Sequence, residues 1–213
     1  MNNTQSKLPR TERNPELTRQ AILDTAFMEI FRNGFQGMRL ENILTETGLT
    51  KGALYHHFKN KQTLGYAVIE DIIQPMIESI WVKPLEASNN PLDTLQTVIK
   101  TLPDMKPDEL IQFGCPLNNL VQEMSPLDEG FRKRLDAVMS LWHESTKAAL
   151  QAGVQSGQIR QDTNCEETAM FIMAAVEGCI GLAKSSQSLE RLRTCLKSIS
   201  GYLASLTIDA SNR

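Results

Sequence analysis

The sequence predicts an all-α protein with a small N-terminal head and a larger C-terminal helical body. Apolar residues recur every three to four positions along most of the chain, which is the period of a helix with one buried face. Residues that start and end helices stand at the ends of these apolar patterns. Signals for strands, such as alternating β-branched runs between turn residues, are nearly absent.

The first helix is predicted over 15–33. Asn14-Pro15-Glu16 supplies a capping side chain, a proline at the first helical position and an acid in the first turn. Three apolar pairs follow at spacings of four residues, and Gly34 ends the helix. A flexible basic arm is expected over 1–14.

Two short helices are predicted next, over roughly 40–47 and 51–57. Gly48 closes the first and Thr50 caps the second, so a tight turn joins them. Such a turn needs a glycine where φ is positive, and this arrangement is typical of a helix-turn-helix motif. We therefore expect a DNA-binding domain over 15–60.

A long fourth helix is predicted to begin after Asn60, with two adjacent apolar rows. Pro75 lies inside this pattern and is expected to kink the helix. Pro84 and the polar stretch 88–91 mark the first predicted break.

Five further helices are predicted in a ligand-binding and dimerisation domain over 61–213. They span roughly 92–102, 116–123, 128 to near Gly157, 165–184, and a last helix with apolar residues at 189, 192, 196, 199, 203 and 206. The segment around Pro103 and Pro107 is expected to be a connection. The spacing in the last helix is that of a helix packed lengthwise against a partner helix.

Charge is distributed unevenly along the chain. The 213 residues carry a net charge of −3, but the first 65 hold nine Lys and Arg against six Asp and Glu, so +3 stands there and −6 in the remainder. A basic head on an acidic body fits a DNA-binding unit attached to a part that does not touch phosphate. No apolar run reaches the roughly 20 residues of a membrane span, and the N-terminus lacks the apolar region of a secretory signal. We expect a soluble cytoplasmic protein without a membrane partner.

Metal and disulfide chemistry are not predicted. The cysteines form no CxxC pair, and the histidines do not fall at metal-ligand spacing near them. We therefore expect no metal and no cofactor, and we interpret each cysteine as a small buried apolar residue. The residues concerned are Cys115, Cys165, Cys179, Cys195, His56, His57 and His143.

The second short helix is suited to entering a DNA groove. A recognition helix presents short or hydrogen-bond-donating side chains at its N-terminal end. Small residues there permit close approach, and Lys51 reaches a phosphate or a guanine edge. The residues that meet this requirement are Thr50, Lys51, Gly52 and Ala53.

The run GLTKGALYHHFKNK over 48–61, with Leu64 after it, resembles the signature of the tetracycline-repressor (TetR) family. Upstream residues stand where that family places its first two helices, so the resemblance covers about 16–66. They are Ile22, Leu23, Ala26, Phe31, Gly34, Phe35 and Ile43. The resemblance implies a homodimer that binds palindromic operator DNA, with a three-helix head, a connecting fourth helix and a variable ligand-binding body.

The resemblance also implies which residues face DNA. They are Thr18, Arg39, Thr50, Lys51, Gly52, Ala53, Tyr55, His56, Lys59 and Lys61. Arg39 stands where the family usually has a Ser or Thr cap, and it is instead expected to contact phosphate. The competing interpretations are packing for Tyr55 and an ordinary solvated face for Lys59 and Lys61.

The dimer interface is expected on the last two long helices, as in the family. Small residues in helix 165–184 permit close approach: Ala174, Ala175, Gly178 and Gly181. The apolar row of the final helix would complete a four-helix interface. The alternative is that both faces pack inside the monomer.

A ligand pocket is expected between the kinked fourth helix and the helices that follow it. Its expected lining is Met76, Ile80, Phe113, Cys115, Leu120, Met124, Trp142, Met173 and Glu177. Aromatic and methionine side chains suit an apolar small-molecule effector, and Glu177 is placed to meet a cation. The alternative for each of these residues is ordinary core packing.

Cys115 is the most specific site hypothesis. The run GCPLNNL over 114–120 resembles the branch of the family that includes the N-ethylmaleimide-responsive repressor, where a cysteine at the matching position senses electrophiles. A cysteine just before a short helix gains from the helix dipole, which lowers the pKa of its thiol. The alternative is a buried cysteine without a redox role.

These observations predict a DNA-binding repressor, not an enzyme, that a small apolar or electrophilic effector releases from its operator. Effector binding would favour a dimer whose heads are wrongly spaced for adjacent major grooves. An all-α enzyme or carrier is the alternative from another class, but no carboxylate pair, nucleophile–base pair or glycine-rich phosphate loop supports it. An activator is a third possibility.

Overall fold

The computed structural model describes residues 14–208, which form an all-helical molecule. Within this part of the chain, extended pairing is limited to one isolated bridge between Ile159 and Thr207. The predicted fold class is confirmed. The arm expected over 1–14 lies outside the described residues, apart from Asn14.

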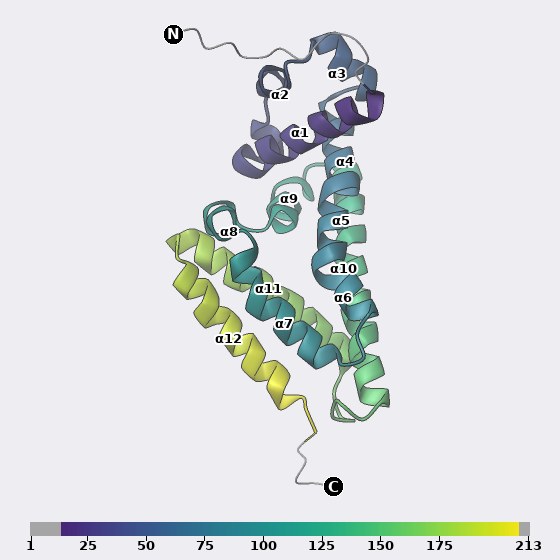
Figure 1. The fold of residues 1–213 in the computed structure, drawn as a ribbon, viewed down its shortest axis with the longest axis vertical. Helices are drawn as coiled ribbons and strands as arrows, with labels where there is room; N and C mark the ends of the chain where they lie inside the picture. The colour runs from purple at the N-terminus through teal and green to yellow at the C-terminus, as the bar shows by residue number, and fades with distance from the viewer. Residues whose placement is uncertain (1–13, 209–213) are drawn as a thin grey trace.

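The head consists of α1 (Pro15–Gly37), α2 (Leu40–Thr47) and α3 (Lys51–His57). The glycines act as predicted: Gly34 interrupts α1 with a φ of 74°, and Gly48 ends α2 in the left-handed region with a φ of 64°. The three helices share a buried core of Ile22, Leu23, Ala26, Ile43, Leu54 and Phe58. Figure 1 shows the head at one end of the molecule.

One continuous helical rod leads from the head into the body. It comprises α4 (Lys61–Val68), the π-helical turn η1 (Ile69–Ile73), α5 (Gln74–Ile77), the π-helical turn η2 (Glu78–Val82) and α6 (Lys83–Glu86). Pro75 and Pro84 each follow a π-helical turn. A proline lacks the N–H and crowds the carbonyl four residues earlier, and the wider π turn makes room for it. The break expected at Pro84 is therefore wrong, because the rod continues to Glu86.

Six helices of the body follow within the described residues. They are α7 (Pro91–Met105), α8 (Pro107–Phe113), α9 (Pro116–Met124), α10 (Glu129–Gln155), α11 (Cys165–Ser186) and α12 (Leu189–Ser205). Five were predicted, and α8 was not. Pro103 lies in the last turns of α7 rather than in a connection, and Pro107 begins α8, followed by Asp108 and Glu109. Proline at the first position and acids in the first turn both favour a helix start.

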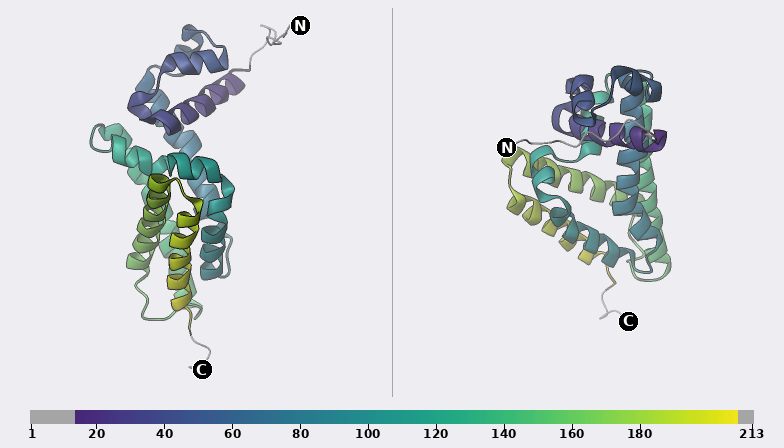
Figure 2. Two further views of the ribbon diagram at one scale, coloured as in Figure 1. Left: turned by 90° about the vertical axis from the view of Figure 1, so that its left-hand side faces the viewer. Right: turned by 45° about the horizontal axis from the view of Figure 1, so that its top comes forward.

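The body helices form two groups below the head. Figure 1 shows the rod beside α10, and α7, α11 and α12 as a second group that crosses the lower body. The short helices fill the space between, since α9 packs against α1 and α8 packs against α11. In the left view of Figure 2, α11 and α12 lie side by side on the face turned to the viewer.

The apolar row of α12 packs inside the monomer, which corrects its prediction as a dimer seam. Leu192, Leu196, Ile199 and Leu203 are at most 3% exposed, and α12 packs against α7 and α11. The spacing of such a row indicates a partner helix. It does not tell whether that helix belongs to the same chain.

A disulfide between Cys179 and Cys195 joins α11 to α12, with 5.5 Å between the two Cα atoms. This corrects the interpretation of these cysteines as separate apolar residues. Their spacing in the sequence carries no signal, because only the packing of the two helices brings them together. Cys115 and Cys165 are free thiols.

The helix α11 is also the one described helix that is long and apolar enough to cross a membrane. Core helices of soluble proteins share this length and composition. Ile172, Val176 and Ile180 of α11 are buried in the body. Core packing therefore accounts for much of its apolar character.

Candidate DNA-binding face and effector cavity

One face of α3 is exposed and polar. The exposed residues of the helix are Lys51, Gly52, Tyr55 and His56, and Lys59, two positions after its end, is exposed as well. Leu54 and Phe58 lie on the opposite side and are buried in the head core. The Lys51 ammonium lies 5.9 Å from the centroid of the Tyr55 ring. The core anchors one side of α3 and leaves the other side free for a partner.

The turn before α3 determines where this face begins. Thr50 Oγ1 accepts a hydrogen bond from the Ala53 N–H at 3.2 Å, as a capping side chain does. Ala53 is half-buried, and Thr50 is exposed. Residues 50–53 therefore lie at the start of the exposed face, where the sequence predicted them.

Lys61 forms hydrogen bonds to the head that the sequence did not predict. Its Nζ donates hydrogen bonds to the carbonyl oxygens of Gln36, at 3.0 Å, and Met38, at 2.8 Å. It also lies 5.1 Å from the centroid of the Phe35 ring. Lys61 therefore ties the start of the rod to the connection between α1 and α2, and its contact with DNA stays a prediction.

The two remaining predicted DNA contacts lie outside α3. Thr18 is half-buried, and its hydroxyl donates to the carbonyl oxygen of Asn14 at 3.3 Å in the first turn of α1. Arg39 precedes α2, and its exposed side chain makes no capping hydrogen bond. Arg39 is therefore the more accessible of the two.

A cavity of about 400 Å³ lies between the rod, α7 to α11 and the head. Five of the nine residues predicted to form a pocket line it: Met76, Ile80, Cys115, Trp142 and Glu177. Part of its wall comes from the head itself, through Phe27 and Phe31 of α1. These two rings stack with centroids 5.6 Å apart.

The other four predicted residues do not line this cavity. The Phe113 ring packs against Phe31 with centroids 5.3 Å apart, and Leu120 and Met124 are buried in the core around α9. Met173 is half-buried and lies one turn before the lining residues of α11. The helical period of the sequence predicts which face of a helix is buried, but it does not predict which turn of that face borders a cavity.

Much of the lining was missed by the sequence reasoning. It comes from α1, η2, α7 and α8, through Phe27, Phe31, Trp81, Leu102, Met105 and Leu110 among others. One signal was present, because the apolar stripe of α1 is two residues wide and therefore broader than the head core requires. The α8 residues were out of reach, because that helix was not predicted.

Two acidic groups in the cavity influence each other. Burial raises the pKa of the Glu177 carboxyl to about 7, against the lowering effect of hydrogen bonds from Cys115 and Asn118. Burial, followed by the charge of Glu177, raises the pKa of the Cys115 thiol well above its ordinary value. Cys115 does directly precede α9 as predicted, without a capping hydrogen bond from its side chain, but the expected low thiol pKa is wrong. Removal from water outweighs the helix start.

The body grips the head at the end of α1. The Glu123 carboxylate on α9 accepts hydrogen bonds from the N–H groups of Phe35, at 2.9 Å, and Gln36, at 2.8 Å. These groups directly follow Gly34, where a side chain would place its Cβ 2.9 Å from Glu123 Oε2. Glycine is therefore required at this position both for its positive φ and for space.

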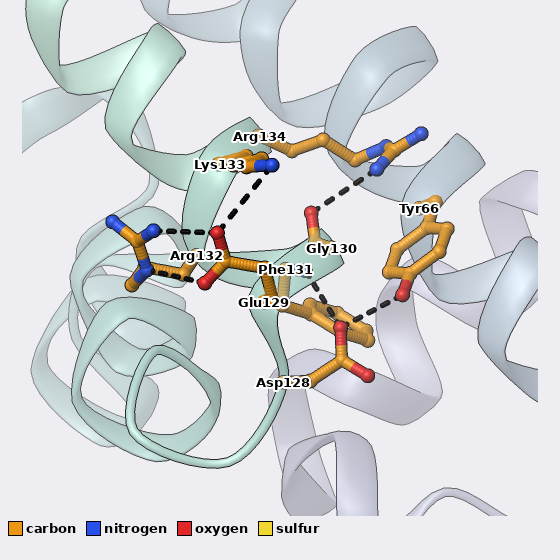
Figure 3. A network of polar contacts seen from close by, with 8 residues as sticks. All are labelled: Tyr66, Asp128, Glu129, Gly130, Phe131, Arg132, Lys133 and Arg134. Atoms are coloured by element: carbon orange, nitrogen blue, oxygen red, sulfur yellow. Dashed lines mark hydrogen bonds and ion pairs between the residues drawn. The ribbon is translucent and has the colours of Figure 1, made fainter.

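A second junction joins the start of the rod to the start of α10, as Figure 3 shows. Asp128 accepts hydrogen bonds from the Tyr66 hydroxyl, at 2.7 Å, and from the Phe131 N–H, at 2.8 Å. These bonds, the backbone one first, lower the pKa of the Asp128 carboxyl. The Arg134 guanidinium lies 4.1 Å from the centroid of the Tyr66 ring and pairs with Glu70 at 2.7 Å.

The outer face of α11 and α12 is open and partly apolar. Met170, Phe171 and Leu182 are 47–57% exposed, which is unusual for large apolar residues. Space is free beyond Gly178 and Gly181, and Ala174 is exposed. This face, rather than the buried row of α12, is the apolar surface that the monomer leaves uncovered.

A cluster of His143, Glu144 and Glu166 brings together atoms that could hold a metal ion. Lys147 forms ion pairs with both carboxylates, and its Nζ lies 3.2 Å from Glu166. This ammonium already supplies positive charge to the two acids. The cluster is therefore explained as a surface ion-pair network.

Comparison with known proteins identifies both halves of the chain. Residues 22–68 match the family described as bacterial regulatory proteins, tetR family, and residues 91–199 match the tetracyclin repressor-like C-terminal domain. An uncharacterized HTH-type transcriptional regulator of Lactococcus lactis is 29% identical over 83% of this chain and 88% of its own length. The HTH-type transcriptional repressor DhaR of a Mycobacterium species is 25% identical over 91% of this chain and 96% of its own. A solved TetR transcriptional regulator of Chloroflexus aurantiacus superposes with a TM-score of 0.81 at 25% identity, covering 92% and 98% of the two chains.

Proposed function

The chain belongs to the TetR family of DNA-binding transcriptional regulators, and we propose that it is a homodimeric repressor released from palindromic operator DNA by a small apolar effector. The observation that carries the proposal is the contact between the cavity and the head: Phe27 and Phe31 belong to the DNA-binding unit and also line the cavity. DhaR, a relative over nearly the whole chain, is named as a repressor. We place its action in the cytoplasm, where the operator lies.

The exposed face of α3 is the proposed DNA-reading surface. Lys51 and His56 offer hydrogen-bond donors, Gly52 lets the helix approach closely, and Tyr55 and Lys59 are assigned to phosphate. Arg39 and Thr18 flank this surface from α2 and α1, with Thr50 and Ala53 at its start. Base-edge contacts from one short helix read only a few base pairs, so a second head on the same DNA is needed for specificity.

The second head comes from a second copy of the chain. We assign the dimer interface to the open face of α11 and α12, where Met170, Phe171 and Leu182 would be buried around the small residues of α11. A two-fold axis through this face relates the two heads and explains why the operator is palindromic.

Effector binding acts on the distance between the two heads. A ligand in the cavity contacts α1 through Phe27 and Phe31, and α1 is also held by Glu123 of α9. If the ligand fits better when α1 is displaced, it shifts the population toward dimers whose heads no longer match adjacent major grooves. The raised pKa of Cys115 favours reversible binding over covalent capture of an electrophile.

The test begins with selection of the operator from random double-stranded DNA. Lys51→Ala and Tyr55→Ala should each weaken binding to the selected DNA by about 1–3 kcal/mol, measured by fluorescence anisotropy. Lys100→Ala, an exposed lysine on α7, is the matched control and should bind like the wild type. Leu182→Glu should convert dimers to monomers in light scattering. Wild-type affinity in both α3 variants would remove α3 from the DNA face.

A further inference from the structure

Two residues that line the cavity each carry a buried polar atom without a hydrogen-bond partner among the described residues. They are the indole Nε1 of Trp142, a residue only 1% exposed, and Oε2 of Glu177. Both residues line the cavity, from α10 and α11. Buried polar groups in folded proteins are nearly always paired, so an unpaired donor and an unpaired acceptor beside one cavity point to a ligand that supplies the partners.

The charge balance of the lining selects the sign of that ligand. Lys106 and Glu109 stand at the rim and pair with each other at 3.1 Å. The thiol of Cys115 stays protonated, because burial raises its pKa. Glu177 therefore remains as the one uncompensated acid in the lining. Asn118 and Cys115, which face it from α9, supply hydrogen bonds but no positive charge.

The rest of the lining is aromatic and aliphatic. Trp81 and Trp142 lie with ring centroids 4.6 Å apart, and Phe27 and Phe31 stack nearby on α1. Aromatic faces attract cations as well as apolar groups. A volume of about 400 Å³ suits a small organic molecule.

From this geometry we infer, on the basis of the proposed function, that the effector is a hydrophobic amine. Its protonated nitrogen donates to Glu177, its apolar body fills the space among Trp81, Trp142 and the α1 phenylalanines, and an acceptor on it takes the Trp142 N–H. A hydrophobic acid would be repelled by Glu177. A neutral molecule of the same shape would leave the carboxylate buried and unpaired.

The inferred pairing has a pH signature. The carboxyl of Glu177 has a pKa of about 7, whereas an alkyl amine stays protonated far above that value. The amine needs the ionised carboxylate, so its affinity should rise as the pH increases through 7 and then level off. Between pH 8 and pH 6 we expect a loss of about tenfold, since only about a tenth of Glu177 is ionised one unit below its pKa. The Cys115 thiol, whose pKa burial raises well above its ordinary value, stays protonated over this interval.

The experiment uses matched pairs of probes on the full-length dimer. Arylalkyl amines of increasing size, from benzylamine to biphenylmethylamine, are each paired with the alcohol and the carboxylic acid of the same skeleton. The chain has two tryptophans, both in the cavity, so intrinsic fluorescence reports binding directly. At least one amine should bind tenfold or more tightly than its alcohol, and Glu177→Gln should abolish this preference while retaining the alcohol's affinity. Glu109→Gln, at the rim, is the control and should keep the preference.

The inference is overturned if no amine binds more tightly than its alcohol, if the acids bind best, or if Glu177→Gln keeps the amine preference. Operator binding without probes is measured in parallel for the wild type and for each variant. Failure to bind any selected DNA would reject the proposed function and leave the amine site intact. DNA release by alcohols as readily as by amines would reject the amine class and leave the repressor intact.

Discussion

In the head, most of the exposed residues assigned to DNA lie on one seven-residue helix or within two positions of its ends, and the side chain that caps this helix directly precedes it. The cavity has the opposite construction. Its lining comes from α1, the rod and α7 to α11, over more than 150 residues of chain, and its important polar atoms are buried. The DNA face is therefore local and exposed, whereas the cavity is non-local and its polar atoms are buried.

The two regions share one element. Phe27 and Phe31 project from α1 into the cavity, while Leu23 and Ala26 of the same helix belong to the head core. Glu123 then fixes the end of α1 to the body through two backbone hydrogen bonds. A helix that serves both regions transmits a change in the cavity without any separate signalling segment.

The largest expected effect on stability comes from removing part of the wall that the head and the cavity share. Phe31 is 9% exposed, and Phe31→Ala should reduce the free energy of unfolding by about 3 kcal/mol through lost burial and a new void. Because the wall is shared, far-ultraviolet circular dichroism, which follows all helices, and tryptophan fluorescence, which follows only the cavity, should shift together in urea. Leu17→Ala, at a 70% exposed position of α1, should shift neither. A fluorescence transition that stays at the wild-type position would show that α1 is not a wall of the cavity.

A second effect of similar size is a pH dependence of the free energy of unfolding, which we expect from the cavity because of Glu177. The pKa of Glu177 is about 7 in the folded protein and lies near 4.5 ordinarily, so folding favours the protonated carboxyl. The stability it contributes is present below pH 4.5 and is lost as the pH rises toward 7. Glu177→Gln, which cannot ionise, should therefore be more stable than the wild type at pH 8 by up to about 3 kcal/mol, and equally stable near pH 4.5.

The measurement is urea unfolding of ligand-free protein at both pH values. Glu109→Gln serves as the control, because its carboxylate is partly exposed and paired with Lys106, and it should show no such pH-dependent gain. A Glu177→Gln variant that is destabilised equally at both pH values would show that the carboxylate has a structural partner in the folded protein.

The contact between the regions can be tested at Gly34. Gly34→Ala should reduce the free energy of unfolding by about 1–3 kcal/mol, because alanine is strained at positive φ and its Cβ would displace Glu123. Gly37→Ala is the matched control three residues later, where φ is ordinary and the nearest atom, Asn33 Cβ, lies at 3.3 Å. Equal, small effects in thermal unfolding of the two variants would contradict a strained grip at Gly34.

The same division explains what the sequence could predict. Gly48, Thr50 and Asn60 were placed correctly because their interactions are local: Thr50 accepts from Ala53, and Asn60 accepts from the Thr63 N–H at 2.8 Å. The all-α fold and the family followed from such local signals. The hydrogen bonds of Lys61 to the connection between α1 and α2 were not predicted, because its partners lie 23 and 25 residues away.

The body resisted prediction for the same physical reason. The row of α12 has the pattern of a helix interface, but only the position of α7 and α11 shows that the interface is internal. Trp142 and Glu177 were expected in a pocket from their residue types, and they line the cavity. Phe27 was missed because the apolar residues of α1 were all assigned to the core of the head. Pro84 was predicted to end the helix, because no pattern in the sequence indicates the π-helical turn that accommodates this proline.

The smallest expected effect concerns Cys115, and it tests whether the thiol in the cavity lining is protected from electrophiles. Cys115 is 8% exposed with a raised thiol pKa, whereas Cys165 is half-buried and its thiol pKa is raised by partial burial alone. Only the thiolate reacts with electrophiles. N-ethylmaleimide should therefore modify Cys165 before Cys115 in the native protein, as followed by mass spectrometry, and both should react at similar rates in urea.

Cys115→Ser should keep operator affinity within a few tenths of a kcal/mol. If Cys115 reacts first and its modification releases DNA, α9 must open far enough to expose the thiol, and the reversible amine pocket would then have to share its site with a covalent sensor.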